Sequence, residues 1–165
     1  MGLAEIAAGL EVTTEQRDRG VATVDRTDEP LADRLAPVAA DLPCDGETAA
    51  TIVERYAGGG SVGAAGRAAG VPPMTAAKTL HLLGESVWPL GDLARDVVRD
   101  WLAGELSRAD ALELARASER EFALAVYVET HDPLPEARAA VTDALAVEEE
   151  TDPLADTRSD TTDLL

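Results

Sequence analysis

A short central stretch of the chain carries side chains suited to holding an anion rather than to breaking covalent bonds. Arg67 and Lys78 supply positive charge, and the hydroxyl and ring groups beside them supply hydrogen bonds. Lysine can reach a phosphate or a guanine edge, and threonine can meet a base edge or a thymine methyl group. The first amide groups of a helix also favour an anion. This chemistry predicts contacts with double-stranded DNA through Ser61, Arg67, Thr75, Lys78, Thr79 and His81.

The region that contains this stretch, residues 46–84, is far less acidic than the rest of the chain. The chain has 165 residues with 14 basic and 32 acidic side chains, a formal charge of −18, whereas residues 46–84 have three basic and two acidic side chains. Lys78 is the only lysine, and asparagine is absent. This composition resembles that of proteins from salt-accumulating halophilic archaea, where molar salt screens self-repulsion. The overall acidity therefore does not exclude a nucleic-acid partner.

Helical periodicity and helix caps, with no alternating strand pattern, predict an all-α helical bundle. Pro37 should kink or break the helix that contains it. The length suits one compact domain or two very small ones. The expected helices cover residues 3–9, 14–19, 28–40, 48–57, 62–69, 74–83, 92–103, 107–117, 118–129 and 136–147.

These helices group into five predicted regions. Residues 1–45 form an N-terminal helical region, 46–84 a helix-turn-helix unit and 85–131 a second three-helix unit, in which residues 92–103 should bury Leu93. Residues 132–147 contain a C-terminal helix. The acidic tail, residues 148–165, has little to bury and is expected to be disordered.

Residues 61–84 have the string SVGAAGRAAGVPPMTAAKTLHLLG. It resembles the helix-turn-helix of DNA-binding regulators, with Ser61 as a cap and Gly70 at the turn. Ala76, Leu80 and Leu83 should face inward, which leaves Lys78 and His81 on the solvent side. The resemblance implies a transcriptional regulator that places helix 74–83 in the major groove. The sequence departs from the pattern at Ala76, where a bulkier branched residue is usual, and in its additional glycines.

A second stretch repeats the first at an offset of 45 or 46 residues. Residues 102–122 are similar to small antitoxin-like helix-turn-helix proteins of unknown function. The second helix of this copy carries glutamates, so it favours protein contacts over phosphate. Phe122, Val126 and Tyr127 are either anchors of an interface or core residues, and the core is the favoured interpretation.

Other site types have little support in the sequence. Gly58–Gly63 matches dinucleotide-binding and nucleophile-elbow patterns, and Lys78-Thr79 matches part of a phosphate loop, but the strands that these sites require are missing. Cys44 and the two histidines lie far apart in sequence, so no metal site or cofactor is expected. We expect a cytoplasmic, non-enzymatic regulator that forms a homodimer, without a membrane segment. The alternative is a protein-interaction module, antitoxin-like or an adaptor, whose helix-turn-helix is only structural.

Overall fold

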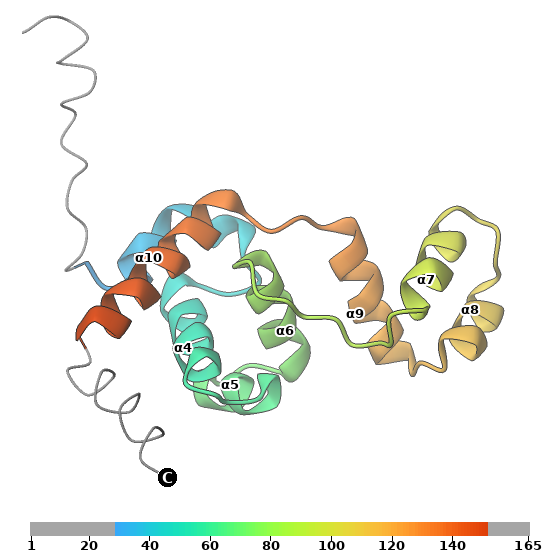
Figure 1. Ribbon diagram of the computed structural model, residues 1–165, viewed down its shortest axis with the longest axis horizontal. Coiled ribbons are helices and arrows are strands. Elements are labelled where there is room, and N and C mark those ends of the chain that lie inside the picture. Colours follow the sequence, from blue (N-terminus) through green and yellow to red (C-terminus); the bar gives the residue numbers. More distant parts are fainter. Residues whose placement is uncertain (1–28, 152–165) are drawn as a thin grey trace, which may run out of the picture.

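The protein is entirely helical over the part of the chain that the structure describes (Figure 1). The computed structural model describes residues 29–151, with side chains up to Val147. These residues form eight α-helices, one 3-10 helix and no strand, which confirms the predicted all-α class. The helices expected over residues 3–9 and 14–19, and the tail from residue 152, lie outside the described residues. The elements are α3 (Leu31–Leu35), the 3-10 helix η1 (Ala36–Asp41), α4 (Gly46–Ala57), α5 (Val62–Ala69), α6 (Pro73–Leu82), α7 (Ala94–Leu102), α8 (Arg108–Ala115), α9 (Glu119–Thr130) and α10 (Pro135–Thr151).

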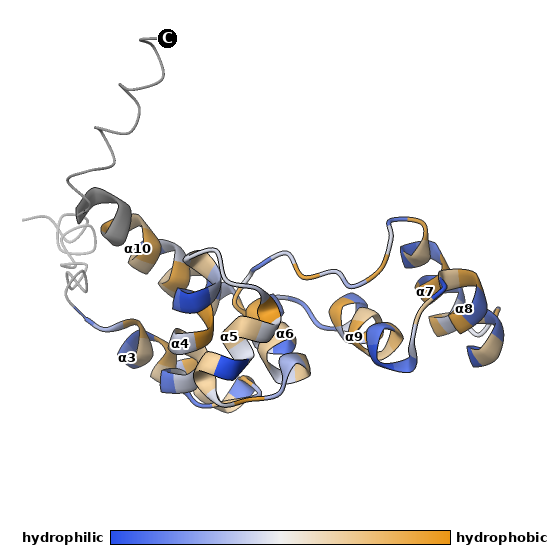
Figure 2. Cartoon of the chain, turned by 90° about the horizontal axis from the view of Figure 1, so that it is seen from below, coloured by the Kyte–Doolittle hydropathy of each residue, from blue (hydrophilic) through white to orange (hydrophobic). Residues whose placement is uncertain are grey.

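The helices form two lobes with separate apolar cores (Figures 1 and 2). The first lobe consists of α3, η1, α4, α5, α6 and α10, and fifteen buried residues form its core. The second lobe consists of α7, α8 and α9, and its core has four buried residues, Val98, Ala111, Phe122 and Ala125. Because α9 contacts both α6 and α7, it is the helix that joins the lobes.

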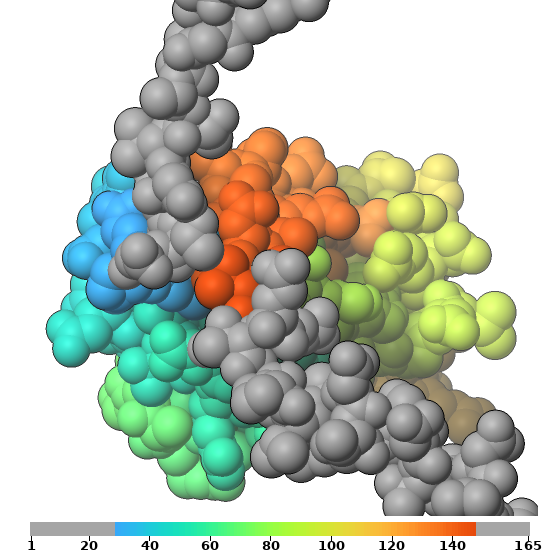
Figure 3. All heavy atoms as spheres, turned by 60° about the vertical axis from the view of Figure 1, so that its left-hand side comes forward, coloured from blue at the N-terminus to red at the C-terminus, as the bar shows by residue number. Residues whose placement is uncertain are grey.

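The two ends of the described chain meet in the first lobe. Figure 3 shows α10 beside the N-terminal elements, and α10 contacts α3 directly. The predicted break at Pro37 is confirmed, because α3 ends at Leu35 and the chain continues as a 3-10 helix. The helix expected over residues 136–147 is longer than predicted and runs from Pro135 to Thr151. The prediction that the disordered tail begins at residue 148 is therefore wrong for residues 148–151, since glutamate is a good helix former.

Local signals set the ends of α5 and α6. The hydroxyl oxygen of Ser61 accepts a hydrogen bond from the amide of Ala64, and Gly70 ends α5 with a φ of 70°. That left-handed conformation favours glycine. Pro73 is the first residue of α6, where its missing N–H costs nothing. The helix, turn and helix are therefore arranged as the sequence predicts.

Close approach of α5 to the start of α6 explains the departure at Ala76. A Cβ placed on Gly66 would lie 3.4 Å from the Cβ of Ala76 and 2.9 Å from the carbonyl oxygen of Val71. Ala76 itself has no exposed surface. A branched residue at position 76 would overfill this space.

We expect Gly66→Ala to lower the free energy of unfolding by about 1–3 kcal/mol, because the new methyl group would collide with the backbone at Val71. Gly63→Ala is the matched control on the same helix. Its methyl group would meet nothing closer than Arg67 Nη1 at 3.6 Å. It should raise stability by about 0.5–1 kcal/mol, because alanine favours a helix over glycine. Urea denaturation measures both, and equal stabilities would contradict the close approach.

The second lobe repeats the local geometry of the first on a smaller core. Ser107 caps α8 as Ser61 caps α5, and each helix ends in a left-handed residue, Arg116 in the case of α8. Ser118 and Glu121 form a capping box at the start of α9. The predicted burial of Leu93 is wrong, because α7 begins only at Ala94 and the Leu93 side chain is 88% exposed.

Candidate interaction site

The C-terminal half of α6 is buried, so the predicted exposure of Thr79 and His81 is wrong. Thr79 has no exposed surface, and His81 is 7% exposed. The Thr79 hydroxyl donates to the carbonyl oxygen of Thr75 at 2.9 Å and lies 3.5 Å from Cys44 Sγ. Ala76, Leu80 and Leu83 face inward as predicted. The helix is covered on more than one face, and neither Thr79 nor His81 is exposed to an external ligand.

The segment between α9 and α10 closes the C-terminal end of α6. His81 Nε2 donates to the carbonyl oxygen of His131, which requires that this nitrogen carry the proton. The amide of Leu134 donates to the carbonyl oxygen of Leu82 at 2.8 Å. Both bonds occupy groups that a free helix end would present to water. They fix α6 against the segment that joins the two lobes.

Lys78 lies against α9 instead of extending into solvent. Its Nζ is 4.6 Å from the centre of the Tyr127 ring, within range for a cation–π contact. His131 stacks on the same ring at 3.9 Å between centroids, and His81 meets it edge-on at 6.3 Å. Burial raises the pKa of the Tyr127 hydroxyl, so this residue stays neutral. The only lysine and both histidines of the chain therefore gather around one tyrosine.

The six predicted DNA-contact residues do not share one accessible surface. Ser61 and Arg67 are exposed, Thr75 and Lys78 are half-buried, and Thr79 and His81 are buried. A methyl group on Gly63 would lie 3.6 Å from Arg67 Nη1 and 4.0 Å from Ser61 Oγ, so these two groups lie near each other on α5. Of the predicted set, the structure thus leaves one cation, Arg67, and one hydroxyl, that of Ser61, exposed.

An apolar groove lies between the two lobes, and the sequence analysis missed it. It has a volume of about 660 Å³, and Arg120 and Glu121 are its only charged lining residues. One wall comes from α5, the turn and the first half of α6, and the other from α9 and the segment before α7. We call it the interlobe groove. It is lined by Val62, Pro72, Pro73, Met74, Ala77, Val87, Trp88, Pro89, Arg120, Glu121 and Leu124.

Several cations of the second lobe are engaged within the lobe. Arg99 and Arg95 both pair with Glu129, and the guanidinium of Arg95 also lies 4.3 Å from the centre of a tryptophan ring. Arg108 pairs with Glu119 and lies over two aromatic rings. Guanidinium groups used in this way are less available to phosphates. The positive charge of this lobe mainly holds its own helices together.

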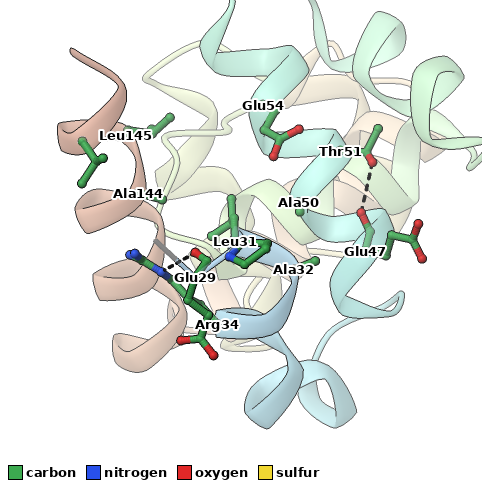
Figure 4. A pocket seen from close by; sticks show the side chains of 12 residues that line it. Glu29, Leu31, Ala32, Arg34, Glu47, Ala50, Thr51, Glu54, Ala144 and Leu145 are labelled. Atoms are coloured by element: carbon green, nitrogen blue, oxygen red, sulfur yellow. Dashed lines mark hydrogen bonds between the residues drawn. The ribbon is translucent and has the colours of Figure 1, made fainter. Parts of the chain in front are cut away.

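A second, smaller pocket lies between α3, α4 and α10 (Figure 4). It has a volume of about 380 Å³, and its polar side chains include Arg34, Glu47 and Glu54. The Thr51 hydroxyl donates to the carbonyl oxygen of Glu47 at 3.0 Å, so it is occupied within its own helix. No cysteine or histidine lines this pocket.

Metal and membrane sites find no support in residues 29–151. Over that range, no three histidine, cysteine or acidic side chains converge where they could hold a metal ion. No helix there has the length and apolar character needed to cross a membrane. Burial raises the pKa of the Cys44 thiol, and Cys44 packs beside the first core as a small apolar residue.

The fold and these contacts define an all-α protein that contains a helix-turn-helix arrangement and an apolar groove between two lobes. The chain belongs to DUF7858, a family of unknown function, whose sequence profile matches residues 1–163. No curated protein and no solved structure shows significant similarity to the chain. Because the family match spans both lobes, the interlobe groove lies within a single family unit.

Proposed function

We propose that the chain is a protein-interaction module in which the helix-turn-helix arrangement packs helices and does not read DNA. One observation carries this proposal: the first half of α6 lines the interlobe groove with Pro73, Met74 and Ala77. In a DNA reader, this part of the second helix contacts base edges. Here the three residues that line the groove are apolar, and residues of α9 line the same groove. Such a strip suits the apolar side chains of a protein partner.

The distribution of cations supports the same proposal. Phosphate contacts from lysine and arginine supply most of the affinity of non-specific DNA binding. Lys78 is engaged with Tyr127, and Arg95 and Arg108 are held by carboxylates and aromatic rings. Of the predicted contact residues, Arg67 is the only exposed cation. One exposed arginine among the six predicted contact residues gives little positive charge for binding a duplex.

The competing proposal keeps a DNA-binding transcriptional regulator. It is favoured by the exposure of Ser61 and Arg67 on α5 and by the near-neutral charge of residues 46–84. It requires Lys78 to leave Tyr127 and extend toward a phosphate. It therefore predicts that reversing the charge of either cation weakens DNA binding.

Titration of the full chain with fluorescent double-stranded DNA of mixed sequence separates the two proposals. The titration is repeated across a potassium chloride series for the wild type, Arg67→Glu and Lys78→Glu. We expect that the wild type shows no saturable binding to DNA that is lost in Arg67→Glu or Lys78→Glu. The tagged chain from its native host should sediment in an assembly that nuclease does not dissolve. A loss of DNA affinity of about tenfold or more in either variant, with unchanged helicity by circular dichroism, would establish the regulator instead.

A further inference from the structure

We infer that the acidic segment of residues 152–165 binds back onto the first lobe, over a cationic surface at the start of α5. This surface consists of Arg55 in the last turn of α4, the turn Gly58–Gly60, and α5 with Arg67, and we call it the acid-free face. It is distinct from the interlobe groove, so the inference goes beyond the proposed function. The segment would be an internal partner that covers this face against other anions.

The acid-free face lies in the longest part of the sequence without a carboxylate. Residues 55–84 contain three cations and no acidic residue, whereas the whole chain has 32 acidic side chains and a net charge of −18. Like charges repel an acidic segment over most of such a molecule. The repulsion is least, and turns to attraction, where arginines are exposed without neighbouring carboxylates. Charge complementarity therefore selects this face for an acidic occupant.

The two arginines of the acid-free face reach the same short piece of backbone. A Cβ on Gly60 would lie 3.2 Å from Arg55 Cγ, and a Cβ on Gly63 would lie 3.6 Å from Arg67 Nη1. Both arginines are exposed. Among the described residues, no ion pair involves either guanidinium, in contrast to the paired arginines of the second lobe. Each can bind a carboxylate through two parallel hydrogen bonds.

The described chain ends close to this face. Figure 1 shows the last turns of α10 beside α4, and Leu145 of α10 lines the smaller pocket together with Glu54 of α4 (Figure 4). Arg55 is the next residue of α4. Beyond Thr151, the segment of residues 152–165 spans up to about 45 Å when extended. A globular unit of the size of the first lobe is about 30 Å across, so the segment can reach the acid-free face.

Attachment to the same chain makes weak contacts sufficient. The segment has four aspartates against one arginine, a net charge of −3. Exposed ion pairs are individually weak, and in molar salt the Debye length of about 3 Å leaves only direct contacts. A tethered segment, however, is present at an effective concentration of about millimolar. Two arginines can therefore hold this segment, although they give little affinity for a free duplex.

Zero-length cross-linking of the full chain tests this contact. A carbodiimide joins a carboxylate to an amine only when the two groups touch, and Arg67→Lys places an amine on the acid-free face with its charge retained. The wild type gives the baseline, because Lys78 is its only lysine. Arg120→Lys is the matched control, since Arg120 is exposed on α9. The reaction is run at the lowest potassium chloride concentration at which circular dichroism shows full helicity, and mass spectrometry maps the products.

We expect amide bonds between position 67 and the aspartates of residues 152–165 in the monomer, and none between position 120 and these aspartates. Arg55→Glu, added to the Arg67→Lys variant, should lower the yield by about threefold or more, because it replaces an attractive charge by a repulsive one. Arg120→Glu changes the net charge of the chain equally and should leave the yield unchanged. Circular dichroism checks that each variant keeps its helices.

Equal cross-linking of the segment to positions 67 and 120 would show that it prefers no surface and would overturn the inference. The absence of a bond between position 67 and the segment in the folded chain would overturn it too. Bonds found only in dimers would assign the face to a second copy, and bonds to residues 1–28 would assign it to that segment, so either result would overturn it. The proposed function is tested separately by the titration with double-stranded DNA, whose outcome changes none of these results.

Discussion

Phe122→Ala should unfold the second lobe while the first lobe stays folded. Phe122 has no exposed surface and is the largest of the four buried residues in the second core. Without it, that core would retain Val98 and two alanines. Replacing a buried phenylalanine by alanine costs about 3–5 kcal/mol, which approaches the whole stability of a small domain. Hydrogen exchange measured by mass spectrometry should show loss of protection in α7 and α8.

The first lobe should stay folded in the Phe122→Ala variant, because its core does not include Phe122. Its fifteen buried residues come from five α-helices, η1 and the residues that follow η1 and α6, and none of them lies in the second core. We therefore expect α4 and α5 to keep their protection in the Phe122→Ala variant. Leu114→Ala is the control, since Leu114 is 61% exposed in the same lobe and its loss leaves no cavity. Retained protection of α7 and α8 would contradict a second lobe that depends on this one aromatic residue.

Helix positions were predictable because their signals are local. Serine at positions 61, 107 and 118 caps α5, α8 and α9 as the sequence suggests, and Gly70 ends α5. Each cap uses a side chain and an amide three residues apart, so its energy needs no distant partner. The inward face of Ala76, Leu80 and Leu83 was predictable for the same reason, since one helical stripe defines it.

The burial of the rest of α6 was not predictable from that stripe. Lys78 and Tyr127 are far apart in sequence, and so are His81 and His131, yet each pair is in contact. One signal was present: α6 carries apolar residues on several faces, as a helix covered on more than one side does. A polar residue on such a helix marks an internal contact as readily as a binding surface.

The interlobe groove lies beyond what residue patterns reveal. Trp88 falls in a segment without helical period, and Met74 and Leu124, which line the same groove, lie on different helices. A tryptophan beside Pro89 in a connection between helices is the one available hint. The groove arises from how α9 sits against α6, and no local signal encodes that placement.

Leu80→Ala should weaken both lobes together, in contrast to Phe122→Ala. Leu80 has no exposed surface and lies in the first core on α6, which contacts α4, α5 and α9. Truncating a buried leucine costs about 2–5 kcal/mol. Because α9 packs on α6, we expect hydrogen exchange to rise in α9 as well as in α4.

Leu102→Ala is the control for the Leu80→Ala experiment. Leu102 is 43% exposed at the end of α7 and lies outside both cores. It should leave the hydrogen exchange of α9 unchanged. Unchanged exchange of α9 in the Leu80→Ala variant would show that the second lobe holds α9 by itself. The groove would then lie between two independent bodies and its width would vary with their motion. Coupled loss in α4 and α9 would instead mean that α6 sets the groove, so that the helix-turn-helix serves the interaction surface by holding one of its walls.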